Sequence, residues 1–128
     1  MLWNNKAKTT QTARSSGNIW EQFAERHLSE QGLKPFTQNF HSRHGEIDLI
    51  MKDNDMIVFI EVKYRKNNLF GGAIAAVTAE KQQKLAKTAK FFLHQQGLNE
   101  YNTTCRFDVI AIEGDANHPD ISWLKNAF

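Results

Sequence analysis

Two stretches decide the fold, Gly45-Glu46-Ile47-Asp48-Leu49-Ile50 and Phe59-Ile60-Glu61-Val62-Lys63-Tyr64-Arg65. Both are rich in the apolar and β-branched residues of core strands, yet both carry charged side chains inside the apolar run. Moving a carboxylate or ammonium group out of water without a partner costs several kcal/mol, so such groups are usually paired, bound to metal or catalytic. The two stretches therefore indicate a functional site built on strands.

The two strands are expected to form an antiparallel hairpin of Gly45–Lys52 and Met56–Arg65, because Asp53-Asn54-Asp55 supplies turn residues between them. The length of the turn decides which side chains meet. A two- or four-residue turn places Asp48 or Glu46 opposite Glu61, whereas an odd-numbered loop without a bulge separates them. The even-numbered turn would thus crowd carboxylates on one face.

Such crowding is repulsive unless a divalent cation neutralises it, and carboxylate oxygens select Mg²⁺ or Mn²⁺. Asp48 and Glu61 are the main candidate ligands, and Glu46 shares the strand face of Asp48. Lys63 lies roughly 6.6 Å along the strand from Glu61 on the same face, where it could hold or activate an attacking water. The pattern predicts metal-dependent phosphodiester hydrolysis. Taken singly, the residues also fit ordinary roles, an ion pair of Glu61 with Lys63 and a polar edge position for Asp48.

A helix is expected from about Gly17 to Gln31, because Trp20, Phe23, Ala24 and Leu28 recur at helical spacing. Glu21 on this helix would supply a further carboxylate if the helix docks beside the hairpin. Otherwise it is a solvated helix charge.

The rest of the chain predicts an α/β fold with a mixed β-sheet flanked by α-helices. Further strands are expected at Leu33–Phe40, Arg106–Ile112 and Ile121–Leu124, and a long amphipathic helix, or a turn followed by one, at Ala73–Gln96. The length of 128 residues suits one domain, residues 17–128. Residues 1–16 are polar and basic and are expected to form a flexible tail, either an ordinary terminus or an arm that binds nucleic acid.

Basic residues gather in one region of a chain whose formal net charge is only +2: from Lys63 to Lys90 there are seven Lys or Arg and one acid, Glu80. Four of them are candidate contacts to nucleic-acid phosphates: Arg65, Lys66, Lys81 and Lys84. The helix lysines could equally form a solvated face. No basic run is interleaved with aromatics as in single-strand binders.

The composition excludes several other classes. No apolar run is long enough to span a bilayer and the start of the chain has no signal-peptide pattern, so a cytoplasmic protein without membrane association is expected. Cys105 is the single cysteine and has no partner for a disulfide or a cysteine metal site.

The hairpin and its surroundings resemble a known family. Asp48, followed after twelve residues by Glu61-Val62-Lys63, is similar to the Asp…(Asp/Glu)-x-Lys signature of restriction-endonuclease-like nucleases. The wider pattern resembles the bacterial YraN family through Gly17, Glu21-x-x-Ala24, Asn39, Gly45–Ile50, Phe59–Arg65, Gly71, Lys81, Arg106–Val109 and Asn126-Ala127-Phe128.

This resemblance extends from Gly17 to Phe128 and implies a restriction-endonuclease-like three-layer fold, akin to that of Holliday junction resolvases. It implies that Glu21, Asp48 and Glu61 form the metal site and that Lys63 is the catalytic lysine. One departure is Trp20, which replaces the glycine usual in the family and is expected to affect how closely the helix or a substrate approaches.

The function expected from these observations is a Mg²⁺- or Mn²⁺-dependent nuclease acting on DNA, including branched DNA such as Holliday junctions. A homodimer would suit this function, because a junction has two strands to cut. A catalytically silent nucleic-acid-binding or repair-complex adaptor with the same fold is the alternative. A third is a structural protein whose charged hairpin is a dimer interface. Metal-dependent cleavage separates the first from the other two.

Overall fold

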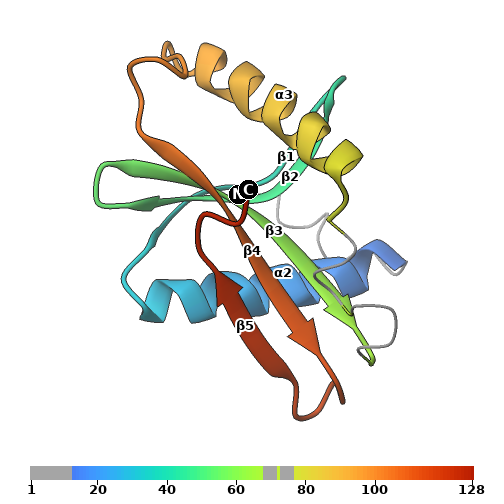
Figure 1. The fold of residues 1–128 in the computed structure, drawn as a ribbon. Coiled ribbons are helices and arrows are strands. Elements are labelled where there is room, and N and C mark those ends of the chain that lie inside the picture. The colour runs from blue at the N-terminus through green and yellow to red at the C-terminus, as the bar shows by residue number, and fades with distance from the viewer. Residues whose placement is uncertain (1–12, 68–71, 73–76) are drawn as a thin grey trace, which may run out of the picture.

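The computed structural model describes residues 13–67, 72 and 77–128, with side chains from Ile19 onward. Its elements, in chain order, are α2 (Ala13–Glu30), β1 (Lys34–Ser42), β2 (Gly45–Asp53), β3 (Met56–Arg65), α3 (Ala79–Gln95), β4 (Cys105–Glu113) and β5 (Asp120–Leu124). Figure 1 shows the strands passing between the two helices. Within the described parts of the chain, no helix is long and apolar enough to cross a membrane.

The five strands form one mixed sheet in the order β1-β2-β3-β4-β5. β2 is antiparallel to both of its neighbours, β1 and β3. β3 and β4 are parallel, and β4 and β5 are antiparallel. A parallel pair needs a crossover connection, and α3 lies in the connection between β3 and β4. The predicted mixed sheet is confirmed.

Each face of the sheet is covered by one helix. Ala24 and Leu28 of α2 pack with one set of strand side chains, which includes Leu49 and Ile60. Leu85, Ala89, Phe92 and Leu93 of α3 pack with the other set, Ile47, Ile50, Ile57 and Phe59. The molecule is therefore a three-layer α/β structure, as predicted, and its arrangement is consistent with the restriction-endonuclease-like fold.

The regular alternation of side chains breaks in the middle of β2. Leu49 packs on the α2 side of the sheet, whereas Ile47 packs on the α3 side although it is two residues away. The break falls at Asp48. The facing residue of β1, Asn39, has a positive φ of 50°. β2 pairs with β3 only as far as Leu49, so the two strands part at Asp48.

The expected element boundaries are close to those observed. β3 has the predicted bounds, and β2 extends one residue beyond its prediction. α2 begins at Ala13, four residues before the expected start, so residues 13–16 of the predicted tail are helical, and the remainder of that tail, residues 1–12, lies outside the described residues. α3 begins only at Ala79, after the N-cap Thr78, and residues 73–76 of the predicted longer helix lie outside the described residues.

Candidate metal centre and basic groove

Asp48 lies where β2 leaves β3, and its side chain replaces the missing strand pairing. Its Oδ2 accepts a hydrogen bond from the Val62 N–H at 2.8 Å. Burial and the nearby Glu61 carboxylate raise the pKa of Asp48 to about 8, with a smaller contribution from Glu21. Asp48 is thus predominantly protonated at neutral pH unless a cation compensates its charge.

Glu61 lies on β3 and is almost fully buried, with 3% of its side chain exposed. It faces α3, and two ammonium groups neutralise it. The Nζ of Lys81 on α3 lies 2.8 Å from Oε2, and the Nζ of Lys63 lies 3.2 Å from the same oxygen. The predicted pair of Glu61 with Lys63 is present, and α3 adds a second lysine.

Glu21 approaches the same point from the opposite layer. Burial raises its pKa, the carboxylates of Glu46 and Glu61 raise it further, and the side chains of Asp48 and Asn39 lie within hydrogen-bonding reach. Oε1 of Glu21 is nevertheless buried without a hydrogen-bond partner of regular geometry among the described residues. A buried unsatisfied carboxylate oxygen is a feature expected of a position that binds a cation or water.

Trp20, the departure from the family pattern, does not displace Glu21 from this site. Its ring stacks on Tyr64 at 4.5 Å between centroids and 11° between planes, against the core on the α2 side. The Tyr64 hydroxyl in turn donates to the carbonyl of Gly114 at 2.7 Å. The large Trp20 side chain therefore packs into the core next to the carboxylates.

Glu21, Asp48 and Glu61 thus converge from α2, β2 and β3, and the donor set is the all-oxygen type that Mg²⁺ and Mn²⁺ prefer. Among the described residues, however, no three acidic, histidine or cysteine side chains already have the arrangement of a closed metal site. The reason is visible at Glu61, whose Oε2 is engaged by Lys63 and Lys81. The residues fit a hard cation chemically, provided that Glu61 exchanges at least one lysine for it.

The two lysines at Glu61 differ in their electrostatics. Burial lowers the pKa of Lys63, and the neighbouring Lys81 lowers it further. Although burial acts against it, the hydrogen bond to Glu61 raises the pKa of Lys81. Lys81 is therefore the permanent cation, and Lys63 is the amine closer to neutrality, which suits a group that handles protons.

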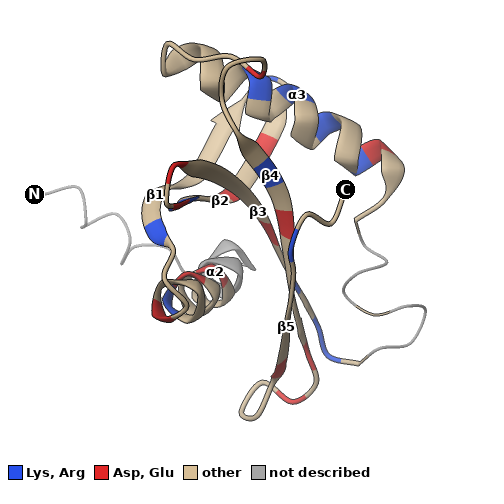
Figure 2. Ribbon diagram, turned by 60° about the vertical axis from the view of Figure 1, so that its left-hand side comes forward, with Lys and Arg blue, Asp and Glu red and all other residues tan. Residues whose placement is uncertain are grey.

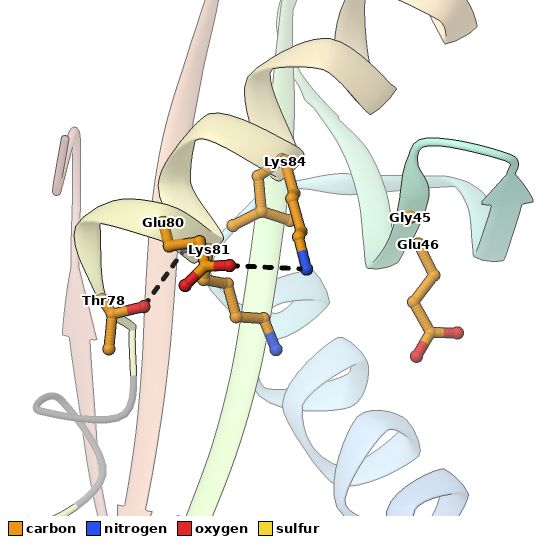
Figure 3. Close-up of a pocket in the computed structure, with 7 residues that line it drawn as sticks. Gly45, Glu46, Thr78, Glu80, Lys81 and Lys84 are labelled. Atoms are coloured by element: carbon orange, nitrogen blue, oxygen red, sulfur yellow. Dashed lines mark hydrogen bonds and ion pairs between the residues drawn. The ribbon is translucent and has the colours of Figure 1, made fainter.

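A pocket of about 350 Å³ opens beside this cluster, between the start of β2 and the first turns of α3. Figure 3 shows Lys81 and Lys84 on the α3 side of the pocket and Glu46 on the β2 side. Glu46 is exposed and pairs with His41 at 3.1 Å, so it lies at the rim and is not part of the buried cluster. Gly45 at the pocket wall has a φ of 143°, and a Cβ there would lie 3.3 Å from Thr88 Oγ1.

The remaining predicted phosphate contacts are exposed. Arg65 and Lys66 lie at the end of β3, and Arg65 shares the strand face of Glu61 and Lys63. An Arg65 Nη1–H donates to the Tyr64 carbonyl at 3.0 Å. Among the described residues, the ion pair of Lys84 is a long one with Glu80, at 4.0 Å, on the surface of α3. In Figure 2 the basic residues form repeated blue bands along α3.

Sequence reasoning missed two members of the cluster. Lys81 was predicted as a phosphate contact and noted in the family pattern, yet it makes the shortest ion pair with Glu61. Asn39 was noted only as part of the family pattern, yet it lies next to Glu21. Helical spacing could not show that the first turn of α3 reaches β3, because that depends on how the helix crosses the sheet.

Asp108, by contrast, is not part of the site. It is fully buried and accepts hydrogen bonds from Arg106 Nε, Trp123 Nε1 and the Asn126 N–H, each at 2.9 Å. Asp108 is thus satisfied by protein groups close to it. This network fastens the end of the chain to β4.

Comparison with known proteins identifies the family. The model of the uncharacterised protein family UPF0102, the YraN family, matches residues 20–112, most of the chain. The chain belongs to this family. The UPF0102 match includes every residue of the acidic and basic cluster described above.

Several UPF0102 proteins are similar over nearly their whole length. A UPF0102 protein of Colwellia psychrerythraea is 57% identical and is covered in full, as is this chain. A UPF0102 protein of Aeromonas hydrophila is 49% identical, and the match covers 91% of this chain and 87% of the Aeromonas protein. A UPF0102 protein of Klebsiella pneumoniae is 46% identical, and the match covers 96% of this chain and 93% of the Klebsiella protein. The family resemblance expected from the sequence is confirmed.

Proposed function

We propose that this UPF0102 protein is a Mg²⁺- or Mn²⁺-dependent nuclease that hydrolyses DNA phosphodiester bonds. The observation that carries the proposal is the convergence of Glu21, Asp48 and Glu61 from both sides of the sheet, next to an amine of lowered pKa. A purely structural ion pair would explain Glu61, but it would not explain why Asp48 and the unsatisfied Glu21 oxygen gather beside it.

In this proposal the carboxylates hold the cation, which would supply Lewis-acid stabilisation of the phosphate when bound. Lys63 positions the attacking water and can accept its proton, because burial and Lys81 disfavour its charged form. Lys81 stays charged and keeps Glu61 oriented. The backbone N–H of Val62 fixes Asp48 in the same way.

Branched DNA is the proposed substrate within this class, and a homodimer is the proposed active form, since a junction has two strands to cut. DNA as substrate makes the cytoplasm the proposed place of action. Arg65, Lys66 and Lys84 are exposed near the cluster and are the proposed phosphate contacts.

The test is cleavage of labelled single-stranded, duplex and four-way-junction DNA with Mg²⁺, Mn²⁺ or EDTA. Wild-type protein should cut only with the metal, and Asp48→Asn and Lys63→Met should each lower the rate by at least about a hundredfold. The exposed Lys34→Met serves as the matched control and should cut normally. Metal-dependent cutting that survives both site variants would place the activity elsewhere.

A second candidate is a DNA-binding adaptor that does not cut. Glu61 favours it, because two lysines already neutralise this carboxylate and could satisfy it permanently. An adaptor would bind DNA equally well in Mg²⁺ and EDTA and would be indifferent to Lys63→Met. Absence of cleavage together with such binding would support this candidate.

A further inference from the structure

A second hollow lies farther along α3 than the pocket beside the carboxylates. It measures about 350 Å³ and is lined by His44, Lys87, Lys90, Phe91, His94 and Glu100. The first pocket has Gly45 and Glu46 in its wall, and the second has His44, the residue just before them. Both hollows therefore lie between the tip of the β1–β2 hairpin and α3, and together they are called the α3 groove below.

One stripe of α3 forms the floor of the α3 groove. Its members recur at spacings of four, three, four and three residues, which places them on one face of a helix: Glu80, Lys84, Lys87, Phe91 and His94. From Lys81 beside Glu61 to Phe91 is a rise of about 15 Å, which corresponds to about four stacked nucleotides.

The α3 groove is lined by four lysines, Lys81, Lys84, Lys87 and Lys90, against three glutamates, Glu46, Glu80 and Glu100, and its lysines suit a polyanion. Among the described residues, Lys87 has no acidic partner within ion-pair distance. In the described part of the chain, the ion pairs of Lys84 and Lys90 are long and largely exposed, at 4.0 Å to Glu80 and 3.8 Å to Glu100. Exposed pairs of this kind contribute little, so these lysines are available to phosphates.

An exposed aromatic ring lies at the far end of the groove. Phe91 is 38% exposed, and its ring centroid lies 6.2 Å from that of Phe40 and 6.0 Å from that of His44. The two neighbouring rings hold Phe91 in place and leave part of its surface open. A base can stack on such a ring only when it is not paired and stacked within a duplex.

We propose that the α3 groove binds an unpaired DNA strand, whose phosphates contact Lys84 and Lys87 and one of whose bases stacks on Phe91. This binding proposal rests on the proposed nuclease function at one point only: the bound strand would extend from the α3 groove to the carboxylates that are proposed to cut it. It adds a substrate class, DNA with a single-stranded segment such as a flap or the opened centre of a junction. The linear sequence has no basic motif interleaved with aromatic residues. In the folded protein, however, the hairpin tip and α3 bring lysines and aromatic rings together.

Binding in EDTA tests the proposal without relying on cleavage. A short fluorescein-labelled single strand and a blunt duplex of the same sequence are titrated by anisotropy. Phe91→Leu, which keeps an apolar side chain but removes the ring, should weaken single-strand binding about five- to tenfold and duplex binding less than about twofold. Phe91→Trp should restore single-strand affinity.

Lys87→Ala should weaken single-strand binding and lower the slope of log affinity against log salt by about 0.7. The matched controls are Phe36→Leu, at another exposed phenylalanine, and Lys34→Ala, and neither should change the affinity. Thermal melting confirms that all variants are folded.

Any of three results would overturn the proposal. Phe91→Leu could leave single-strand affinity unchanged, it could lower single-strand and duplex affinity equally, or the wild type could bind neither DNA. The outcomes separate it from the nuclease function. If the protein cut DNA with metal but Phe91→Leu did not change single-strand binding, the nuclease function would be supported and the α3 groove proposal would be wrong. If single-strand binding depended on Phe91 but no DNA was cut, the α3 groove proposal would be supported and the nuclease function would be wrong.

Discussion

Asp48 and Glu61 are carboxylates in adjacent strands, but the protein stabilises them differently. Glu61 remains close to two ammonium groups, whereas Asp48 receives one backbone N–H and retains a proton near neutral pH. The difference follows from the layers. Glu61 faces α3 and its lysine, while Asp48 lies between Glu61 and Glu21, where a second negative charge is disfavoured.

This difference predicts that metal-free protein loses stability as pH rises. An aspartate titrates near pH 3.9 in the unfolded chain and near 8 in this fold, so the folded state holds the extra proton between those values. The free energy of unfolding should therefore fall from pH 5 to pH 8, by at most about 1.4 kcal/mol per pH unit. Urea denaturation in EDTA measures it.

In Asp48→Asn this fall should be much smaller, with a remainder from Glu21, whose pKa is also raised. Saturating Mg²⁺ should stabilise the wild type more at pH 8 than at pH 6, because binding displaces the proton. A pH profile that is the same in Asp48→Asn and wild type would show that Asp48 is not the group that titrates.

Lys81 is predicted to position Glu61 for the proposed reaction. In Lys81→Met the buried carboxylate loses its shorter ion pair, so stability should fall by about 1–3 kcal/mol and cleavage by more than the unfolded fraction explains. Lys81→Arg should recover most of both. Cleavage rate and urea denaturation, measured on the same samples, separate the two effects.

Lys84→Met is the matched control, because Lys84 is exposed and only loosely paired. It should change stability by less than about 0.5 kcal/mol. If Lys84→Met and Lys81→Met lowered cleavage equally, Lys81 would be one phosphate contact among several.

The elements were largely predictable because their signals are local. Apolar runs and the Asp53-Asn54-Asp55 turn predicted the hairpin, and helical spacing predicted both helices. The register was left open between an even and an odd turn, and the pairing of Asp53 with Met56 shows the even one. The break at Asp48 was not predictable, because the pattern of a single strand gives only a strict alternation of side chains. It coincides with a positive φ at Asn39 in the neighbouring strand, which the pattern of β2 cannot reveal.

The break predicts contrasting effects of two substitutions at Asn39. Asn39→Ala should destabilise the fold by about 1 kcal/mol, because alanine tolerates a positive φ less well than asparagine does. Asn39→Gly relieves that conformational cost, so it should be closer to wild type in stability, yet it still removes the amide beside Glu21.

Both variants should therefore weaken Mn²⁺ binding alike while differing in stability. Calorimetric titration and thermal melting give the two readouts. Unaltered Mn²⁺ affinity in Asn39→Gly would mean that the side chain has no part in holding Glu21.

The whole molecule places the site between layers, which no single segment reveals. The sequence predicted the three layers and the acidic residues, but whether Glu21 was a solvated charge or part of the cluster depended on how α2 packs. The role of Lys81 depended in the same way on α3. The chain end was informative only through the family pattern, yet in the structure Phe128 stacks on Phe107 and the Ala127 N–H donates to the Phe107 carbonyl at 2.7 Å.

The network that fastens the chain end should matter for stability and not for chemistry. Asp108→Asn removes the charge opposite Arg106, which is mostly buried, and should lower the free energy of unfolding by about 3 kcal/mol. Mn²⁺ affinity and cleavage, corrected for the folded fraction, should be unchanged. A loss of Mn²⁺ affinity in fully folded Asp108→Asn would link this network to the site.

The most direct measurement is an anomalous difference map from crystals soaked in Mn²⁺ and recorded at the manganese edge. We predict a peak among the carboxylates of Glu21, Asp48 and Glu61, with Glu61 released from at least one of its lysines, and no such peak in Asp48→Asn. A saturating soak that leaves this position without a peak, with Glu61 still held by Lys63 and Lys81, would contradict a metal-dependent nuclease.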